Sequence, residues 1–173
     1  ARALLAEAGY ENGEGFPVVE YLYNTSDAHK AVAEALQYMW EEELGVKVTL
    51  NNQEWAAFLQ TRKDGDYSIA RNGWIADYND PISFLDMWMT GGGNNDAQYS
   101  NEEYDSLIKE AKTTTDVKER MELLHKAEDK IIGEDNALAP LYFYTQKYML
   151  ADGIEGMYYC PLGYFFFGYT HQA

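Results

Sequence analysis

Apolar residues recur at helical spacing along residues 26–44. They are Val32, Leu36, Met39, Trp40 and Leu44. This period predicts a helix with one buried stripe, in which Met39 and Trp40 are core residues. Gly45 follows the last apolar position. A left-handed glycine commonly ends a helix at this place, so we expect the helix to stop there.

Runs of β-branched and aromatic residues lie on both sides of this helix. Residues 16–24 and 46–51 are two such runs, and residues 67–70 form a third. These residue types favour strands. The first two runs and the helix therefore predict a strand–helix–strand unit with a right-handed crossover. Polar and apolar positions alternate imperfectly in residues 16–24, so we expect both faces of this strand to be covered.

Two shorter helices are predicted in the first half of the chain. Residues 1–9 are good helix formers, with Gly9 placed to end the helix. Residues 54–63 form the second, and its spacing predicts that Trp55, Phe58 and Leu59 are buried.

The second half of the chain begins with a predicted helix at residues 81–89. Three glycines at residues 91–93 then predict a flexible loop. Ser100 with Glu103 reads as a capping box that starts the next helix. Residues 117–132 predict another helix, residues 137–150 a long aromatic strand, and residues 154–169 a C-terminal strand region. The order of elements predicts an α/β fold with a mixed sheet flanked by helices.

Composition and charge narrow the classes of function. The 173 residues are 46% hydrophobic and 15% aromatic, which is typical of a folded domain. The net charge of −16 argues against nucleic acid and anionic membrane surfaces as partners, because both would be repelled. Cys160 is the only cysteine, so no internal disulfide forms. No apolar run is long enough to span a bilayer, and no signal peptide is visible, so we expect the chain to be an excised fragment.

The most informative stretch is residues 68–88, SIARNGWIADYNDPISFLDMW. Pro81 suits the first position of a helix and Asp80 suits the N-cap, which gives Asp80 a structural explanation. Asp77 lies in the connection from strand to helix, where ligand crevices of open α/β sheets form. With Trp74 and Tyr78 as aromatic walls, Asp77 is a candidate to hold a cation. A solvated loop aspartate is the alternative.

GWIADYNDP with SFLDMW resembles the signature of the extracytoplasmic oligopeptide- and dipeptide-binding proteins of ABC importers. The segments LLAEAGY, MWEEELGVKVTL and PLGYFFFGY are also similar to that family. The resemblance implies that Asp77 pairs with the α-ammonium group of a peptide and that Trp74 borders the ligand. It also implies that Arg71 approaches a ligand carboxylate, with a structural ion pair as the alternative, and that residues 95–100 lie close to the peptide path.

The resemblance implies one lobe of a type II periplasmic-binding-protein-like fold. Residues 1–136 would form the core of a ligand-binding lobe, and residues 137–173 would return toward the hinge. The implied partners are a peptide ligand, an ABC permease and its ATPase. The implied location is outside the cytoplasm, in the periplasm or peripheral to the membrane through a lipid anchor. Neither a cofactor nor a catalytic role is expected.

Other readings remain open at this point. A receptor of the same architecture for an oligosaccharide, a nickel complex or haem would not need Asp77. A metal site at His29, His125 and His171 has little support because these residues are far apart in sequence. An acidic glycoside-processing enzyme would use Asp77 with Asp80 or Glu54. The sequence has neither a phosphate-binding loop nor a serine or cysteine triad.

Overall fold

The computed structural model describes residues 1–173. The chain divides into two compact units, Ala1–Gly73 and Trp74–Ala173. The boundary falls inside the informative stretch, between the third strand and the acidic turn. Arg71 therefore belongs to the first unit, whereas Trp74, Asp77 and Tyr78 belong to the second. The division predicted at residue 136 stays a prediction.

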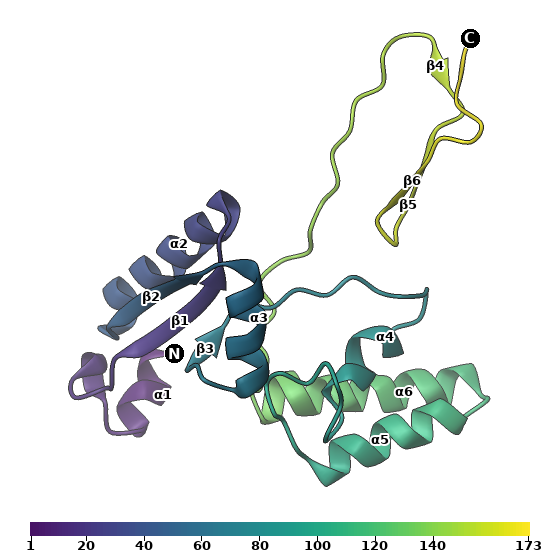
Figure 1. Cartoon of the computed structure of the whole chain (residues 1–173). Coiled ribbons are helices and arrows are strands. Elements are labelled where there is room, and N and C mark those ends of the chain that lie inside the picture. Colours follow the sequence, from purple (N-terminus) through teal and green to yellow (C-terminus); the bar gives the residue numbers. More distant parts are fainter. The chain divides into compact units, whose positions relative to one another are not determined.

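The first unit is a parallel sheet with helices packed on it (Figure 1). Its elements in chain order are α1 (Arg2–Glu7), η1 (Glu11–Gly13), β1 (Val19–Asn24), α2 (Asp27–Leu44), β2 (Val48–Gln53), α3 (Trp55–Asp64) and β3 (Ile69–Ala70). The strand order is β2-β1-β3, with Val19 opposite Val48 and Tyr21 opposite Ile69. The predicted strand–helix–strand unit is confirmed.

Both faces of β1 are covered, as its imperfect alternation predicts. Tyr21 and Tyr23 join a buried cluster with Ala33 and Leu36 of α2. Leu22 points to the opposite face and is fully buried there. The central strand of the sheet is thus enclosed on both sides, which is typical of parallel sheets.

Three residues predicted to be buried in this unit are exposed: Met39, Trp55 and Leu59. Met39 is 47% exposed, because α2 turns Ala33 and Leu36 toward the sheet; Trp40 is half-buried against the same cluster. On α3 only Phe58 is fully buried, while Trp55 and Leu59 are exposed. Helical spacing defines a stripe of apolar residues, but packing decides which edge of the stripe meets the sheet.

Gly45 ends α2 in the left-handed conformation, as predicted. Its φ is 69°, a region that costs residues with a Cβ more than glycine. A side chain at residue 45 would also overlap the backbone of Asn12. The glycine is therefore required both by the helix end and by the close approach of the η1 segment.

The second unit begins with a bundle of short helices. Its elements are α4 (Ile82–Leu85), η2 (Asp86–Trp88), α5 (Glu102–Thr113), α6 (Val117–Glu128) and η3 (Asp129–Glu134), the last in π-helical form. Helices α5 and α6 lie side by side (Figure 1). Tyr104, Ile108, Leu124 and Ile131 are the largest fully buried side chains of their common core.

The start of α5 differs from the prediction by one residue. Asn101 is the N-cap, and its side-chain Oδ1 accepts hydrogen bonds from the amides of Glu103 and Tyr104. The predicted capping box of Ser100 and Glu103 is wrong. Asparagine is at least as good an N-cap as serine. Ser100 and Asn101 were therefore both suitable N-caps for α5, and the folded chain uses Asn101.

The three-glycine loop is held more firmly than its composition suggests. The Asn95 side chain donates to the carbonyl oxygens of Trp88, Met89 and Tyr99 at 2.8–3.3 Å, and it accepts from the Tyr99 amide. A Cβ at Gly92 would crowd the carbonyl oxygens of Met87 and Met89. One amide side chain thus braces the loop, and the expected flexibility of the loop stays a prediction.

The C-terminal stretch contains only short strands. The predicted strand at residues 137–150 is absent: the stretch is irregular, because no ladder forms along it. Farther on, β4 (Ile154–Glu155) pairs with β7 (His171–Gln172), and β5 (Tyr158–Cys160) pairs with β6 (Tyr164–Phe166), both antiparallel. The α/β class is confirmed, with the parallel strands and the antiparallel pairs in separate sheets.

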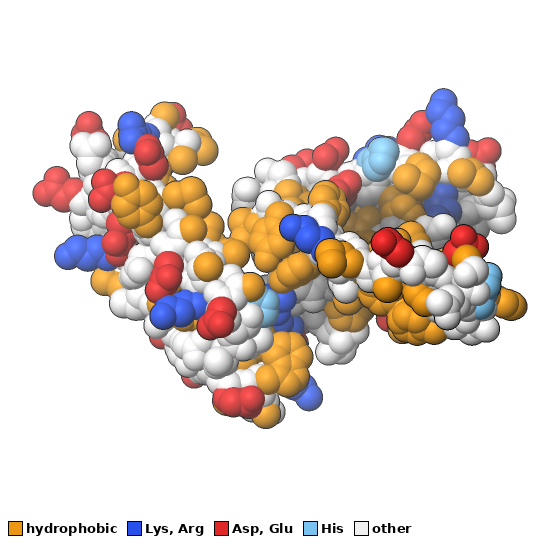
Figure 2. Space-filling model, turned by 90° about the horizontal axis from the view of Figure 1, so that it is seen from above, with side chains coloured by type: hydrophobic (Ala, Val, Ile, Leu, Met, Phe, Trp, Pro, Cys, Tyr) orange, Lys and Arg blue, Asp and Glu red, His pale blue; other side chains and the backbone are white.

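Aromatic rings cover part of the β5–β6 hairpin. Phe166 stacks on Tyr158 at 4.7 Å between ring centroids, and Phe165 lies against Tyr159 and Tyr148. Phe167 is 63% exposed. On the face drawn in Figure 2, hydrophobic side chains lie at the surface among scattered acidic ones. None of the helices has an apolar stretch long enough to cross a membrane.

Candidate ligand-binding site

The segment that follows β3 leaves its backbone unpaired. The last ladder bond runs from the Arg71 amide to the Leu22 carbonyl oxygen at 2.8 Å. Gly73 donates only to the Asn72 side chain, and the amides of Trp74, Ile75 and Ala76 donate to no group in the chain. This run is irregular rather than helical. An unpaired run of this kind offers donors and acceptors to an added strand.

Asp77 ends this segment with an exposed, unpaired carboxylate. Its amide donates to the hydroxyl of Ser83 at 3.0 Å, and Ser83 is buried in α4. The carboxylate accepts no hydrogen bond and forms no ion pair within the chain. The structure therefore fixes the backbone of Asp77 and leaves its charge available.

The two aromatic residues beside Asp77 have different surroundings. Trp74 is half-buried and packs against the core that contains Ile82 and Trp88. Its indole Nε1 is buried and has no hydrogen-bond partner, an uncommon state for a buried polar atom. Tyr78 is 47% exposed. Trp74 is thus a firm support for the turn, whereas Tyr78 presents a ring to solvent.

Arg71 lies in the first unit, at the carboxyl ends of two parallel strands. Its Nη1 donates to Oδ1 of Asn24 at 3.2 Å, and Asn24 is buried at the end of β1. His29 lies nearby, with Nδ1 at 3.3 Å from the Asn24 carbonyl oxygen. Burial, followed by the positive charge of Arg71, lowers the pKa of His29.

Sequence reasoning singled out Arg71 but assigned no role in this group to Asn24 or His29. The signal that could have found them is topological. The residues just after parallel strands and at the start of the next helix meet at one edge of the sheet. Asn24 ends β1 and His29 lies in the first turns of α2, so both belong to this edge.

Asp80 stabilises the start of α4, but its prediction as the N-cap is wrong by one residue, because α4 begins at Ile82 and its N-cap is Pro81. Its Oδ1 accepts from the Ile82 amide at 2.9 Å and from Nη2 of Arg120 at 2.9 Å. The hydrogen bond from Arg120 is the main cause that lowers the pKa of the Asp80 carboxyl. Asp80 thus closes the turn that carries Asp77 and ties it to α6.

The two carboxylates considered as partners of Asp77 in glycoside chemistry, Glu54 and Asp80, are hydrogen-bonded within the chain. Glu54 caps α3 by accepting from the Ala56 amide at 3.1 Å. Asp80 has a lowered pKa, whereas a general acid needs a raised one. No group of three or more His, Cys, Asp or Glu side chains is arranged to hold a metal ion.

Comparison with known proteins places the chain in a family. The family model described as "Bacterial extracellular solute-binding proteins, family 5 Middle" matches residues 1–96, which is more than half of the chain. The chain belongs to this family.

Relatives of this family-5 chain include the oligopeptide-binding protein OppA of Bacillus subtilis. It is 41% identical over 154 residues, which cover 88% of this chain and 28% of that protein. An oligopeptide ABC transporter structure from Bacillus anthracis (substrate-binding domain) matches 99% of this chain and 34% of its own, with a TM-score of 0.84 and 31% identity.

A third related structure contains a peptide. It is OppA of Haemophilus influenzae in complex with RPPGFSPFR, which matches 89% of this chain and 30% of its own. The TM-score is 0.79 and the identity 36%. The chain spans less than a third of the length of the Bacillus subtilis relative described above. The matched residues 1–96 include Arg71, Trp74, Asp77 and Tyr78.

Proposed function

We propose that this chain is part of a longer two-lobed receptor that captures peptides outside the cytoplasm and delivers them to an ABC permease. One observation carries the proposal: the backbone of residues 74–76, whose amides donate to no group in the chain, leads directly to the exposed, unpaired carboxylate of Asp77. An extended peptide can pair with such a backbone in any side-chain sequence. Its α-ammonium group would then meet a carboxylate.

The proposed roles follow from the surroundings of each residue. Asp77 holds the α-ammonium group, because its charge is not neutralised within the chain. Trp74 supports the turn from the core side and borders the ligand, and the exposed Tyr78 forms a wall. Arg71 serves a ligand carboxylate, with Asn24 holding one guanidinium nitrogen in place. None of these roles requires a catalytic step or a cofactor.

The exposed apolar side chains of residues 137–173 fit the same proposal. Phe143 is 97% exposed and Met149 is 96% exposed, and apolar surface of this kind gains free energy when it is covered. We assign this stretch to the return toward the hinge, with residues 1–136 as the core of the ligand-binding lobe. The remaining two thirds of a family member's length would supply the cover.

The partners and location belong to the whole receptor. The permease and its cytoplasmic ATPase are proposed because a related structure is described as an oligopeptide ABC transporter. A location of the receptor outside the cytoplasm is supported by the family description of extracellular solute-binding proteins. Attachment to the membrane would be peripheral, through a lipid anchor or by docking on the permease.

Calorimetric titration of the full-length receptor with di- to pentapeptides tests this function. We expect binding that weakens by about 1.5–3 kcal/mol in Asp77→Asn, because a charge-assisted contact is lost. N-terminal acetylation of the peptide should weaken binding of the wild type by a similar amount. The two changes should not add, since they remove the same contact.

Glu128→Gln is a matched control. Glu128 is an exposed carboxylate on α6, so its removal changes the net charge by the same amount without touching the turn. Its peptide affinity should equal that of the wild type. Absence of heat with every peptide, or equal affinity for free and acetylated peptides, would reject the assignment of Asp77 and favour a sugar or metal-complex ligand.

A further inference from the structure

One arginine connects the acidic turn to the helical bundle. Arg120 of α6 donates from Nη2 to Oδ1 of Asp80 at 2.9 Å and from Nε to the Ala111 carbonyl oxygen at 3.1 Å. Its side chain is 23% exposed and that of Asp80 is 30% exposed. The pair is thus mostly shielded from solvent, where an ion pair with good geometry holds its partners more firmly than at an open surface.

Asp80 passes this constraint to the turn that carries Asp77. The Asp80 amide donates to the Tyr78 carbonyl oxygen at 2.9 Å, and the Asp80 carbonyl oxygen accepts from the Ser83 amide at 3.1 Å. The Ser83 hydroxyl in turn accepts from the Asp77 amide at 3.0 Å. An unbroken series of hydrogen bonds therefore leads from Arg120 to the backbone of Asp77.

The side chain of Arg120 also lies within electrostatic range of Tyr78. The contact to Asp80 is the main cause that raises the pKa of Arg120, and Tyr78 adds to it. The guanidinium group of Arg120 is thus tied to the turn through Asp80. Lysine could not replace it, because the two contacts use two different nitrogens of a rigid fork.

We propose that Arg120 is a positioning residue for the ammonium end of the ligand: through Asp80 it holds the turn that presents the Asp77 carboxylate. The inference rests on the peptide-binding function proposed above and adds a residue that does not touch the ligand. It predicts that the loss of Arg120 weakens recognition of a free α-ammonium group while the rest of the ligand is bound as before.

Whether the loss of Arg120 weakens or strengthens ammonium binding distinguishes a positioning role from a direct electrostatic one. Arg120 is a cation near a site proposed to take a cation, so removing its charge without moving the turn would strengthen ammonium binding. Displacement of Asp77 would weaken it instead. A geometric role and a charge role therefore change the affinity in opposite directions.

The test measures affinities of the full-length receptor for a peptide and for its N-acetylated form, in wild type, Arg120→Gln, Arg120→Lys and Asp80→Asn. We expect Arg120→Gln to bind the free peptide about tenfold more weakly, which equals about 1.4 kcal/mol, with unchanged affinity for the acetylated form. Arg120→Lys should lose affinity similarly. Asp80→Asn combined with Arg120→Gln should cost little more than either change alone.

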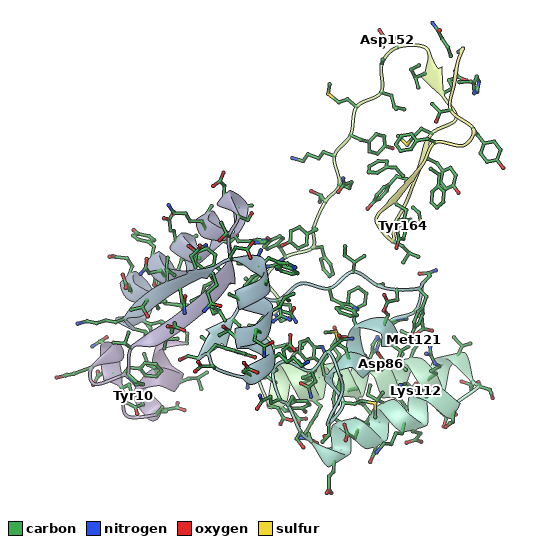
Figure 3. All side chains as sticks on the ribbon, viewed as in Figure 1. Tyr10, Asp86, Lys112, Met121, Asp152 and Tyr164 are labelled. Carbon is green, nitrogen blue, oxygen red and sulfur yellow. The ribbon has the colours of Figure 1, made fainter.

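Lys112→Gln is the matched control. Lys112 of α5 pairs with Asp86 at 3.1 Å, just after α4, and both side chains are labelled in Figure 3. This variant breaks a neighbouring ion pair on the same helical bundle and leaves the contact of Arg120 with Asp80 in place. Its ratio of affinities for free and acetylated peptide should match that of the wild type.

Each other outcome overturns the inference. Equal weakening for both peptides in Arg120→Gln would mean a general structural role, and unchanged or stronger binding of the free peptide would mean that Asp77 keeps its place without Arg120. Thermal unfolding of every variant identifies loss of fold, in which case Arg120→Lys and Asp80→Asn give the answer. An Asp77→Asn variant that binds normally would instead reject the proposed function itself.

Discussion

The second unit contains two regions that differ in the burial of their hydrophobic side chains. In the helical body, residues 74–136, Tyr104 and Ile108 are fully buried. In the aromatic tail, residues 137–173, Phe143 and Met149 are almost fully exposed, although the tail is the richer of the two in large apolar residues.

The difference lies in the spacing of apolar residues and the presence of a partner. Apolar positions of α5 and α6 recur at helical spacing, so each helix presents a stripe that the other covers within the same chain. An extended aromatic segment satisfies its backbone only by pairing with other strands, and residues 146–150 have none. Hydrophobic content thus predicts a core only where the chain itself supplies the opposing surface.

Hydrogen exchange should separate the two regions most strongly. The amides of Ile108 and Leu124 lie in helices, whereas those of Tyr148 and Met149 have no backbone acceptor. We expect exchange of the two helix amides to be at least ~1,000-fold slower, because they open only with local or global unfolding. Exchange of the isolated chain, followed by mass spectrometry or NMR, measures this ratio. Slow exchange at Met149 would contradict the contrast.

Truncation of one apolar side chain in each region sharpens the comparison. Ile108→Ala should lower the free energy of unfolding by about 2–5 kcal/mol, because it leaves a cavity in the body. Phe143→Ala should change it by less than about 0.5 kcal/mol, since its side chain is already in water. Chemical denaturation of both variants provides the measurement. Equal effects would mean that the tail is packed as tightly as the body.

Removal of a single hydroxyl group should change the free energy of unfolding by less than truncation of a buried side chain does. The Tyr104 hydroxyl donates to the Leu85 carbonyl oxygen at 2.6 Å inside the body, whereas Tyr169 is 79% exposed in the tail. Tyr104→Phe should cost about 1–2 kcal/mol of stability and leave the part-buried carbonyl group of Leu85 without this donor. Tyr169→Phe should cost nothing measurable in the same denaturation experiment.

The free energy of unfolding should also depend on pH through Tyr104. Burial is the main cause that raises the pKa of Tyr104 above its ordinary value. The folded state therefore holds this proton more tightly than the unfolded state does. Its contribution to stability is complete below about pH 10, the pKa of an unfolded tyrosine, and is lost as the pH rises toward the folded value. Tyr104→Phe should flatten this alkaline decline in stability, which chemical denaturation at several pH values measures.

Local sequence signals predicted most elements of the first unit. The helix over α2, its end at Gly45 and the strand–helix–strand order all follow from residue period, glycine position and β-propensity. Asp80 as the residue that closes the helix start also follows from its place before Pro81. These features depend on neighbours within a few positions, so the sequence alone contains the required information.

Other features depended on residues far away in the chain. The exposure of Met39 was decided by which edge of α2 meets the sheet, and the absence of a strand at residues 137–150 by the lack of a partner. The contact of Arg120 with Asp80 joins positions forty residues apart, and the group formed by Arg71, Asn24 and His29 joins three elements. No local pattern marks such pairs.

The sequence by itself determined the α/β class, the family resemblance and the acidic turn centred on Asp77, because these reside in residue type and short-range spacing. The tertiary structure alone decided that the Asp77 carboxylate is unpaired, that Asn95 braces the glycine loop and that Arg120 holds the turn. The physical reason is that pairing and burial are properties of surroundings, which the chain acquires only when distant segments meet.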